Sequence, residues 1–311
     1  MSTQRNQVLS VKEARNFLIN YQGLNTACRY TQEKGVISYF EKVGCIQYDP
    51  LNVVGRNADL TLQSRVKGYH ADMLYKLLYQ KRTVIDAWDK MMALYLQKDW
   101  PYFKRLRASK GKEIEAVLAR RNSLQALEHL DEVREHIKKH GPSQSSSIDI
   151  GVCNPGKWGS KKLASAAMDY LFNIGELGIY SKNNVQRTYE FTEKLLKKEI
   201  LEESDPFQSD DEFYEWYVKR RIGSVGMLWA CNGGGWLGHF ISDSDIRNSK
   251  IKRLLEKGEI EEFYVESVKN PFYIRSEDTE YLNKKSTKKE VKFLAPLDLS
   301  LIHISEPTRP R

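Results

Sequence analysis

The chain has 311 residues, of which 41% are apolar, 29% charged and 11% aromatic. This composition is typical of a globular protein and excludes a disordered one, and the length is sufficient for two or three domains. The 49 Lys and Arg residues exceed the 41 Asp and Glu residues, giving a net charge of +8 that favours a polyanionic partner.

A capping box marks the first predicted helix. Ser10 is followed three residues later by Glu13, and apolar residues then recur on one face. Residues 31–43 have the same periodicity and predict a second helix. Residues 45–49 alternate over a short run, which predicts an extended segment that ends at Pro50.

Two further helices are predicted before residue 124. The first spans 71–81, and a strongly basic one begins near residue 104, beside two aromatic residues. Basic residues interleaved with aromatics suit contact with phosphates. A solvated helix face has the same pattern, so both interpretations remain open.

Residues 124–207 have the element order of a winged helix-turn-helix module. Helices are predicted over 130–139 and 160–173, and two short strands then meet around Asn183 and Asn184. The same order recurs over residues 208–296. The elements predicted there are helices over 211–221, 224–231 and 244–257, followed by hairpin strands over 260–266 and 272–275.

The predicted fold is mainly α-helical with small β-hairpins (α+β). We expect tandem winged helix-turn-helix modules, with boundaries at 1–123, 124–207 and 208–296. Residues 297–311 are assigned to a tail. The last residues resemble the peptide encoded by read-through of a sequencing adapter, although an ordinary disordered tail is the alternative.

Several protein classes are excluded by the rest of the sequence. The N-terminus is polar and lacks the apolar core of a secretory signal. The longest stretch without charged side chains, 222–242, is broken by a glycine run and does not resemble a membrane span. The cysteines are far apart, as expected for reduced thiols rather than a zinc site. We therefore expect a cytoplasmic protein without a metal, and the DNA partner predicted below would place it at the nucleoid.

The most informative segment is residues 44–65. Gln47 and Asp49 lie two residues apart, so an extended backbone would point both to the same side. A carboxylate can stabilise a developing cation or take a proton from water, and a carboxamide can hold that water. This pair suits cleavage of a glycosidic bond. A turn carboxylate beside a solvated Gln is the structural alternative.

The same segment resembles the signature of the YcaQ/AlkZ-type winged-helix DNA glycosylases, bacterial enzymes that unhook interstrand crosslinks. The resemblance rests on Ile46-Gln47-Tyr48-Asp49 with the residues up to Ser64-Arg65, and on the segments beginning at Trp88 and Trp100. It extends over nearly the whole chain, to about Asp298. The Gln-x-Asp form is similar to the YcaQ-like branch.

The resemblance implies a monofunctional enzyme that excises N7-alkylated purines and opens crosslinks without a cofactor. By match to the motif, Asp49 would stabilise the oxocarbenium-like sugar or activate water, and Gln47 would position that water. N7-alkylation makes the purine cationic, so it leaves without a strong general acid. A crosslinked base is not easily flipped into a tight pocket, so an open, concave, basic surface is expected.

The chain departs from the family pattern at three positions. Many relatives have His where this chain has Ala58, Asp59 and Lys90. Family members also continue beyond the equivalent of Asp298, so we expect a C-terminal portion to be missing.

The partner predicted from these features is duplex DNA with alkylated purines or crosslinks, bound by a monomer away from any membrane. The alternative is a winged-helix transcriptional regulator without catalysis, which would prefer one operator sequence. The residues expected to contact DNA are Arg56, Lys90, Lys161, Lys162 and Arg187.

Overall fold

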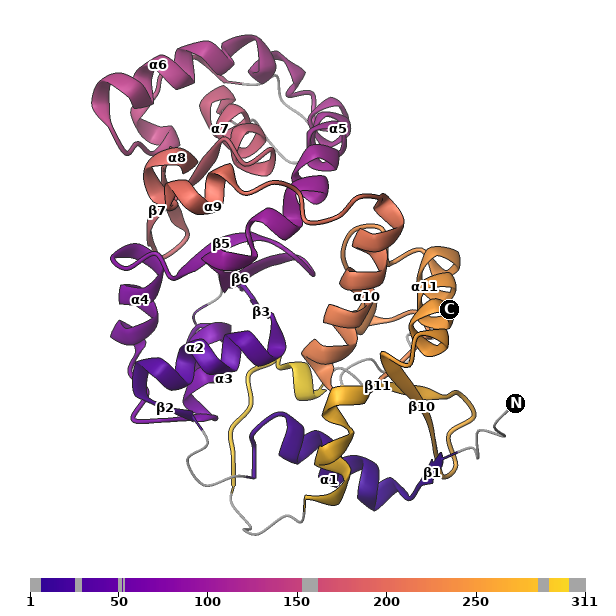
Figure 1. Cartoon of the computed structure of the whole chain (residues 1–311). Helices are drawn as coiled ribbons and strands as arrows, with labels where there is room; N and C mark the ends of the chain where they lie inside the picture. Colours follow the sequence, from indigo (N-terminus) through magenta and orange to yellow (C-terminus); the bar gives the residue numbers. More distant parts are fainter. Residues whose placement is uncertain are drawn as a thin grey trace. The chain divides into compact units, whose positions relative to one another are not determined.

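The computed structural model describes residues 7–25, 30–49, 52, 54–152, 162–284 and 291–301 (Figure 1). The chain divides into two compact units. Unit 1 comprises Met1–Leu74, Asp89–Leu96 and Phe207–Arg311, and unit 2 comprises Tyr75–Trp88 and Gln97–Pro206. Helices with small sheets build both, so the predicted mainly α, α+β class is confirmed. The three-module division and the concave surface remain predictions.

Unit 1 contains most of the strands. Its helices are α1 (Val11–Tyr21), α2 (Gln32–Val43), α3 (Asn57–Gln63), α10 (Asp210–Val225) and α11 (Ser244–Glu256), and α4 (Ala71–Tyr79) starts in it. Its strands are β1 (Gln7–Leu9), β2 (Tyr30–Thr31), β3 (Cys45–Gln47), β4 (Val66–Lys67), β6 (Met92–Leu96), β9 (Leu228–Trp229), β10 (Ile260–Val265) and β11 (Phe272–Arg275).

The order β1-β10-β11-β9 forms one sheet, in which β1 is parallel to β10 and the other pairs are antiparallel. The hairpin of β10 and β11 was predicted, whereas β1 was not. The sheet packs on α1, where the Phe17 and Tyr21 rings stack 5.6 Å apart and contact Tyr281 edge-on. Burying rings of this size contributes about 1.5–3 kcal/mol each.

Capping explains where two helices of unit 1 begin. The Ser10 hydroxyl accepts from the Glu13 N–H at 3.2 Å, and the Glu13 carboxylate accepts from the Ser10 N–H at 2.8 Å, which confirms the predicted capping box. Ser209 caps α10 through its hydroxyl alone, which accepts from the Glu212 N–H at 3.2 Å, while the Glu212 carboxylate accepts from the Gln208 N–H. Acidic residues in the first turn of α10 also complement the helix dipole.

The short helix predicted over 224–231 is wrong. Helix α10 continues to Val225 and stops at Gly226, whose φ of +99° lies in the left-handed region. A side chain there would also collide with Tyr21, since a Cβ would lie 2.3 Å from the ring. The chain then enters β9, which pairs with β11. Glycine therefore ends the helix because only glycine accepts this backbone and this contact.

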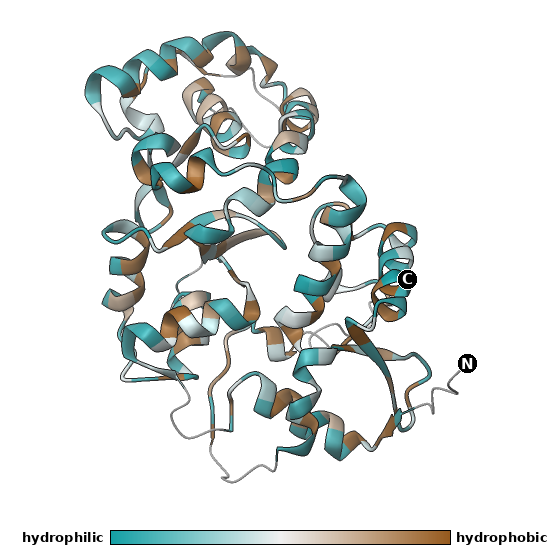
Figure 2. Ribbon diagram, in the orientation of Figure 1, coloured by the Kyte–Doolittle hydropathy of each residue, from teal (hydrophilic) through white to brown (hydrophobic). Residues whose placement is uncertain are grey.

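Unit 2 contains the predicted wing-like hairpin. Strands β7 (Leu177–Asn183) and β8 (Gln186–Phe191) pair antiparallel, with Asn183 opposite Gln186 at the turn. The remaining regular elements of this unit are β5 (Val84–Trp88), α5 (Lys104–Arg120), α6 (Leu130–His140), α7 (Leu163–Asn173), α8 (Thr192–Leu195) and α9 (Lys198–Glu202). Figure 2 shows hydrophobic and hydrophilic residues alternating along these helices, as expected for helices with one buried face.

Candidate active site

Gln47 and Asp49 lie at and just beyond the end of β3, and both residues are half-buried. Strand β3 pairs antiparallel with β6, with Gln47 opposite Ala93. The Tyr48 N–H continues this pairing by donating to the Met92 carbonyl at 2.9 Å. The predicted extended segment is therefore present, and it leads the motif out of the sheet into a partly exposed position. That both side chains point to one side remains a prediction.

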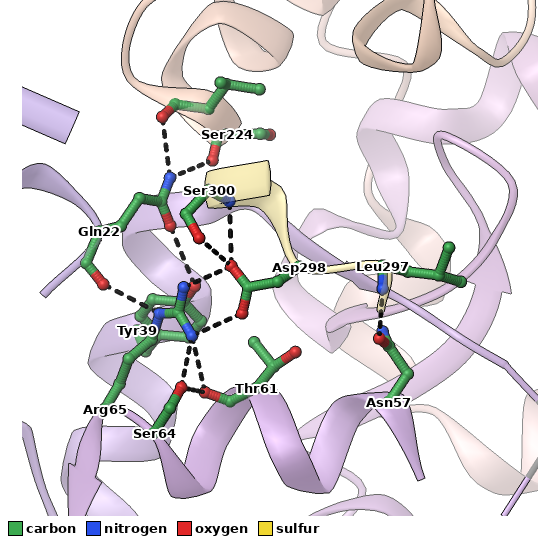
Figure 3. Close-up of polar contacts among 11 residues, drawn as sticks. Gln22, Tyr39, Asn57, Thr61, Ser64, Arg65, Ser224, Leu297, Asp298 and Ser300 are labelled. Carbon is green, nitrogen blue, oxygen red and sulfur yellow. Dashed lines mark hydrogen bonds and ion pairs between the residues drawn. The ribbon is translucent and has the colours of Figure 1, made fainter. Parts of the chain in front are cut away.

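Asn57, the first residue of α3, ties the motif strand to a distant segment. Its side-chain amide donates to the Gln47 carbonyl at 2.8 Å. Its side-chain carbonyl accepts from the Leu297 N–H at 3.2 Å (Figure 3). Asn57 is buried. Both halves of one carboxamide are thus used to join β3, α3 and the C-terminal segment.

A buried ion pair holds the other end of α3. The Arg65 guanidinium donates two parallel hydrogen bonds to the Asp298 carboxylate, at 2.8 and 2.7 Å, and neither side chain is exposed (Figure 3). Arg65 also donates to the Gln22 carbonyl, and the Gln22 amide donates to the Ser224 and Val225 carbonyls. The network connects α3 with the ends of α1 and α10.

A second buried network lies behind the start of β3. The Asp89 carboxylate accepts from Arg220 at 3.1 Å and from Arg221 at 2.9 Å, and it is fully buried. Arg220 also donates to the Gly44 carbonyl at 2.9 Å, immediately before β3. Burial and the neighbouring Asp89 raise the pKa of the Cys45 thiol to about 12, which keeps the thiol protonated and hydrogen-bonded to Asp89. Cys45 is thus a structural thiol.

The comparisons with known proteins decide between enzyme and regulator. A model of the family "DNA glycosylase AlkZ-like" matches residues 40–308. The chain belongs to this family. It is therefore a DNA glycosylase that acts on DNA, and the regulator is not favoured. The fold is similar to that of Streptomyces sahachiroi DNA glycosylase AlkZ, with a TM-score of 0.59 and 13% identity over 90% of this chain and 74% of that one.

Two of the predicted DNA contacts of the glycosylase lie in unit 1 with the motif. Arg56 directly precedes α3, and its Nε donates to the Asp59 carboxylate at 2.5 Å. Tyr69 donates to the other oxygen of Asp59. Asp59 thus provides an ion-pair partner to Arg56. Lys90 follows Asp89 in the turn before β6 and is only 5% exposed, which leaves little of it for a phosphate.

The other predicted contacts of the glycosylase belong to unit 2. Lys162 is exposed and occupies the N-cap position of α7. Arg187 lies on β8, where its guanidinium is 3.7 Å from Asp169. Lys161 lies outside the described residues. The structure therefore groups Gln47, Asp49, Arg56 and Lys90 in one unit and Lys162 with Arg187 in the other, and DNA contact by any of them remains a prediction.

The basic helix of the glycosylase, α5, has intramolecular partners for two of its cations. Arg105 pairs with Asp205 at 2.8 Å, and Arg107 stacks on the Trp100 ring at 3.7 Å. Within the described residues, no helix is long and apolar enough to cross a membrane. In the same part of the chain, no three His, Cys, Asp or Glu side chains gather as they would around a metal ion.

Sequence reasoning missed the residues that hold the motif in place. Asn57 and Asp298 are ordinary polar residues in sequence, and the contacts Asn57–Leu297 and Asp298–Arg65 join positions more than 200 residues apart. Arg65 stands out only as the end of the family segment, and its neighbours Gln63, Ser64 and Lys67 are polar, so nothing in the sequence indicates that it is buried. The partner itself could not be predicted without the tertiary structure.

Proposed function

We propose that this glycosylase hydrolyses the N-glycosidic bond of N7-alkylated purines, and that it unhooks interstrand crosslinks made through the same atom. The observation that supports this most is the placement of Gln47 and Asp49, a carboxamide and a carboxylate at the partly exposed end of one strand in a member of a DNA glycosylase family. The enzyme would act as a monomer on duplex DNA.

The chemistry requires a fixed anion and a placed water molecule. An N7-alkylpurine is cationic, so the bond from its N9 to the sugar C1′ breaks with the electron pair leaving on the base. Asp49 stabilises the positive charge that develops on the sugar, and Gln47 holds the water that adds to C1′. The water proton passes to Asp49 or to solvent, and the products are the free base and an abasic site.

Base release from duplex DNA with a single N7-methylguanine or a single mustard crosslink tests this function. The abasic product is read as alkali-labile strand breaks. We expect release by the wild type and a loss of about 10²–10³-fold in the single-turnover rate for Asp49→Asn, with DNA affinity retained, since one electrostatic group at the reacting centre is typically worth that much.

Asp72→Asn serves as the matched control because Asp72 is an exposed aspartate in the first turn of α4. It should leave the rate unchanged. Absence of release by the wild type from both substrates would contradict the proposal, as would equal rates for the wild type and Asp49→Asn. Tight binding to one preferred sequence without release would indicate a regulator instead.

A further inference from the structure

We propose that Asn57 is a positioning residue for Gln47, and that residues 295–301 hold Asn57 in place and are therefore part of the catalytic module. The role assigned to Gln47 rests on the proposed function. The contacts that link these residues do not depend on that function: one buried carboxamide forms both of them, with the Gln47 carbonyl and with the Leu297 N–H.

The pairing of β3 explains why Gln47 needs such a partner. In an antiparallel pair, successive residues of a strand point their backbone groups alternately toward and away from the neighbouring strand. The Tyr48 N–H bonds to Met92 on the β6 side, so the carbonyl of the preceding Gln47 points away from β6. Asn57 meets it there, and the backbone at Gln47 is fixed on both sides.

The 295–301 segment is well anchored to serve as a support. Ala295 and Leu299 are buried, and the Asp298 N–H closes a turn by donating to the Ala295 carbonyl at 3.0 Å. The Asp298 carboxylate pairs with Arg65. Leu297 and Asp298 are adjacent, so one short turn holds the first residue of α3 and the residue that follows its C-cap (Figure 3).

Loss of the Asn57 bridge is expected to affect rate more than binding. The bridge acts on the backbone that aims Gln47, and it involves no predicted DNA contact. A misplacement of the order of 1 Å at a reacting group costs about 10²-fold in rate. A residue with a merely structural role would lower stability without separating rate from affinity.

The test compares Asn57→Asp and Asn57→Ala with Asn20→Asp and Asn20→Ala. Asn20 is the matched control because it is also a buried asparagine of unit 1 whose side-chain amide donates to a backbone carbonyl, that of Lys284 at 2.5 Å, away from the motif. The single-turnover rate of base release is measured with enzyme in excess over N7-methylguanine duplex, and the Kd for the same duplex is measured separately.

We expect both Asn57 variants to lose about 10–100-fold in rate with Kd changed less than about twofold, and both Asn20 variants to keep the wild-type rate. Equal rates for the Asn57 and Asn20 variants would overturn the proposal. Asn57→Ala decides the test if Asn57→Asp does not fold, because alanine places no charge beside the Gln47 carbonyl.

Amide hydrogen exchange separates failure of this inference from failure of the proposed function. If the wild type releases no base, the proposed function fails, and the exchange of peptides covering 45–49 and 291–301 still tests the support. Faster exchange in both peptides for Asn57→Ala than for Asn20→Ala would support the inference that Asn57 and residues 295–301 hold Gln47 in place. Unchanged exchange in the 45–49 peptide would overturn it whatever the activity.

Discussion

Replacing Asp89 by Asn should destabilise unit 1 strongly without changing its shape. The Asp89 carboxylate is buried, with Arg220 on one oxygen and Arg221 on the other. Asparagine keeps one acceptor and turns an N–H group toward a guanidinium, so that the buried Arg221 and the partly buried Arg220 lose the carboxylate they share. Removing one partner of a buried ion pair costs about 3–5 kcal/mol, a large part of the roughly 5–15 kcal/mol that stabilises a typical protein.

The pH dependence of this cost has a defined sign. Burial alone would raise the pKa of Asp89, but Arg220 and then Arg221 lower it below the ordinary carboxyl value of 3.8. A carboxyl group whose pKa is lowered in the folded state contributes stability that is present above its unfolded pKa and lost as the pH falls through the folded pKa. The difference in the free energy of unfolding between the wild type and Asp89→Asn should therefore be largest at neutral pH and become smaller below about pH 4.

Urea unfolding of the full chain between about pH 2.5 and 7, followed by tryptophan fluorescence and by proteolysis of unit 1 peptides, measures this difference. A difference below about 1 kcal/mol at pH 7 would refute the uncompensated-charge argument. A large difference that stays constant down to the lowest pH would show that packing rather than the charge of Asp89 is responsible.

Three further substitutions test other parts of unit 1. Gly44→Ala should lower the free energy of unfolding by more than the ~1 kcal/mol that a left-handed backbone (φ +78°) costs alanine, because its Cβ would lie 2.9 Å from the Arg220 guanidinium. Thermal unfolding measures this loss. Gly226→Ala should be more harmful in the same assay, since its Cβ would meet the rigid Tyr21 ring rather than a flexible side chain. Asp59→Asn should tighten DNA binding and steepen its salt dependence because it removes the carboxylate that pairs with Arg56. An unchanged slope in a salt titration would contradict a DNA contact by Arg56.

Some local features of the fold could be predicted from the sequence, whereas the tertiary contacts could not. The capping box at Ser10, the end of the extended segment near Asp49 and the hairpin strands all depend on neighbouring residues, so their patterns are visible in the chain. Strand β1 was missed because three residues have no periodicity of their own, and its partner β10 lies some 250 positions away.

The candidate site, too, was predicted only in part from the sequence. The motif was predicted from its residue types and from the family resemblance. Its supports were not, since Leu297 and Asp298 act through a backbone N–H and through a side chain whose partner is set only by folding. Nor could the sequence show that Lys90 is 5% exposed, and its contact with DNA remains a prediction.

The strand that holds the motif is fixed through its backbone at both ends, which predicts how Gln47→Ala should behave. Arg220 donates to the Gly44 carbonyl just before β3, and Asn57 donates to the Gln47 carbonyl at its end. Neither contact uses the Gln47 side chain, and that residue is half-buried rather than buried.

Gln47→Ala should consequently change the free energy of unfolding by no more than about 0.5–1 kcal/mol while the rate of base release falls, because the fold does not depend on that carboxamide. Asn57→Ala should lower the free energy of unfolding more than Gln47→Ala does, by about 1–3 kcal/mol, because it leaves the Gln47 carbonyl without its donor. Urea unfolding of the two variants side by side measures both. A Gln47→Ala protein as unstable as Asn57→Ala would mean that the side chain of Gln47 supports the fold, and its loss of activity would then no longer indicate a role in placing water.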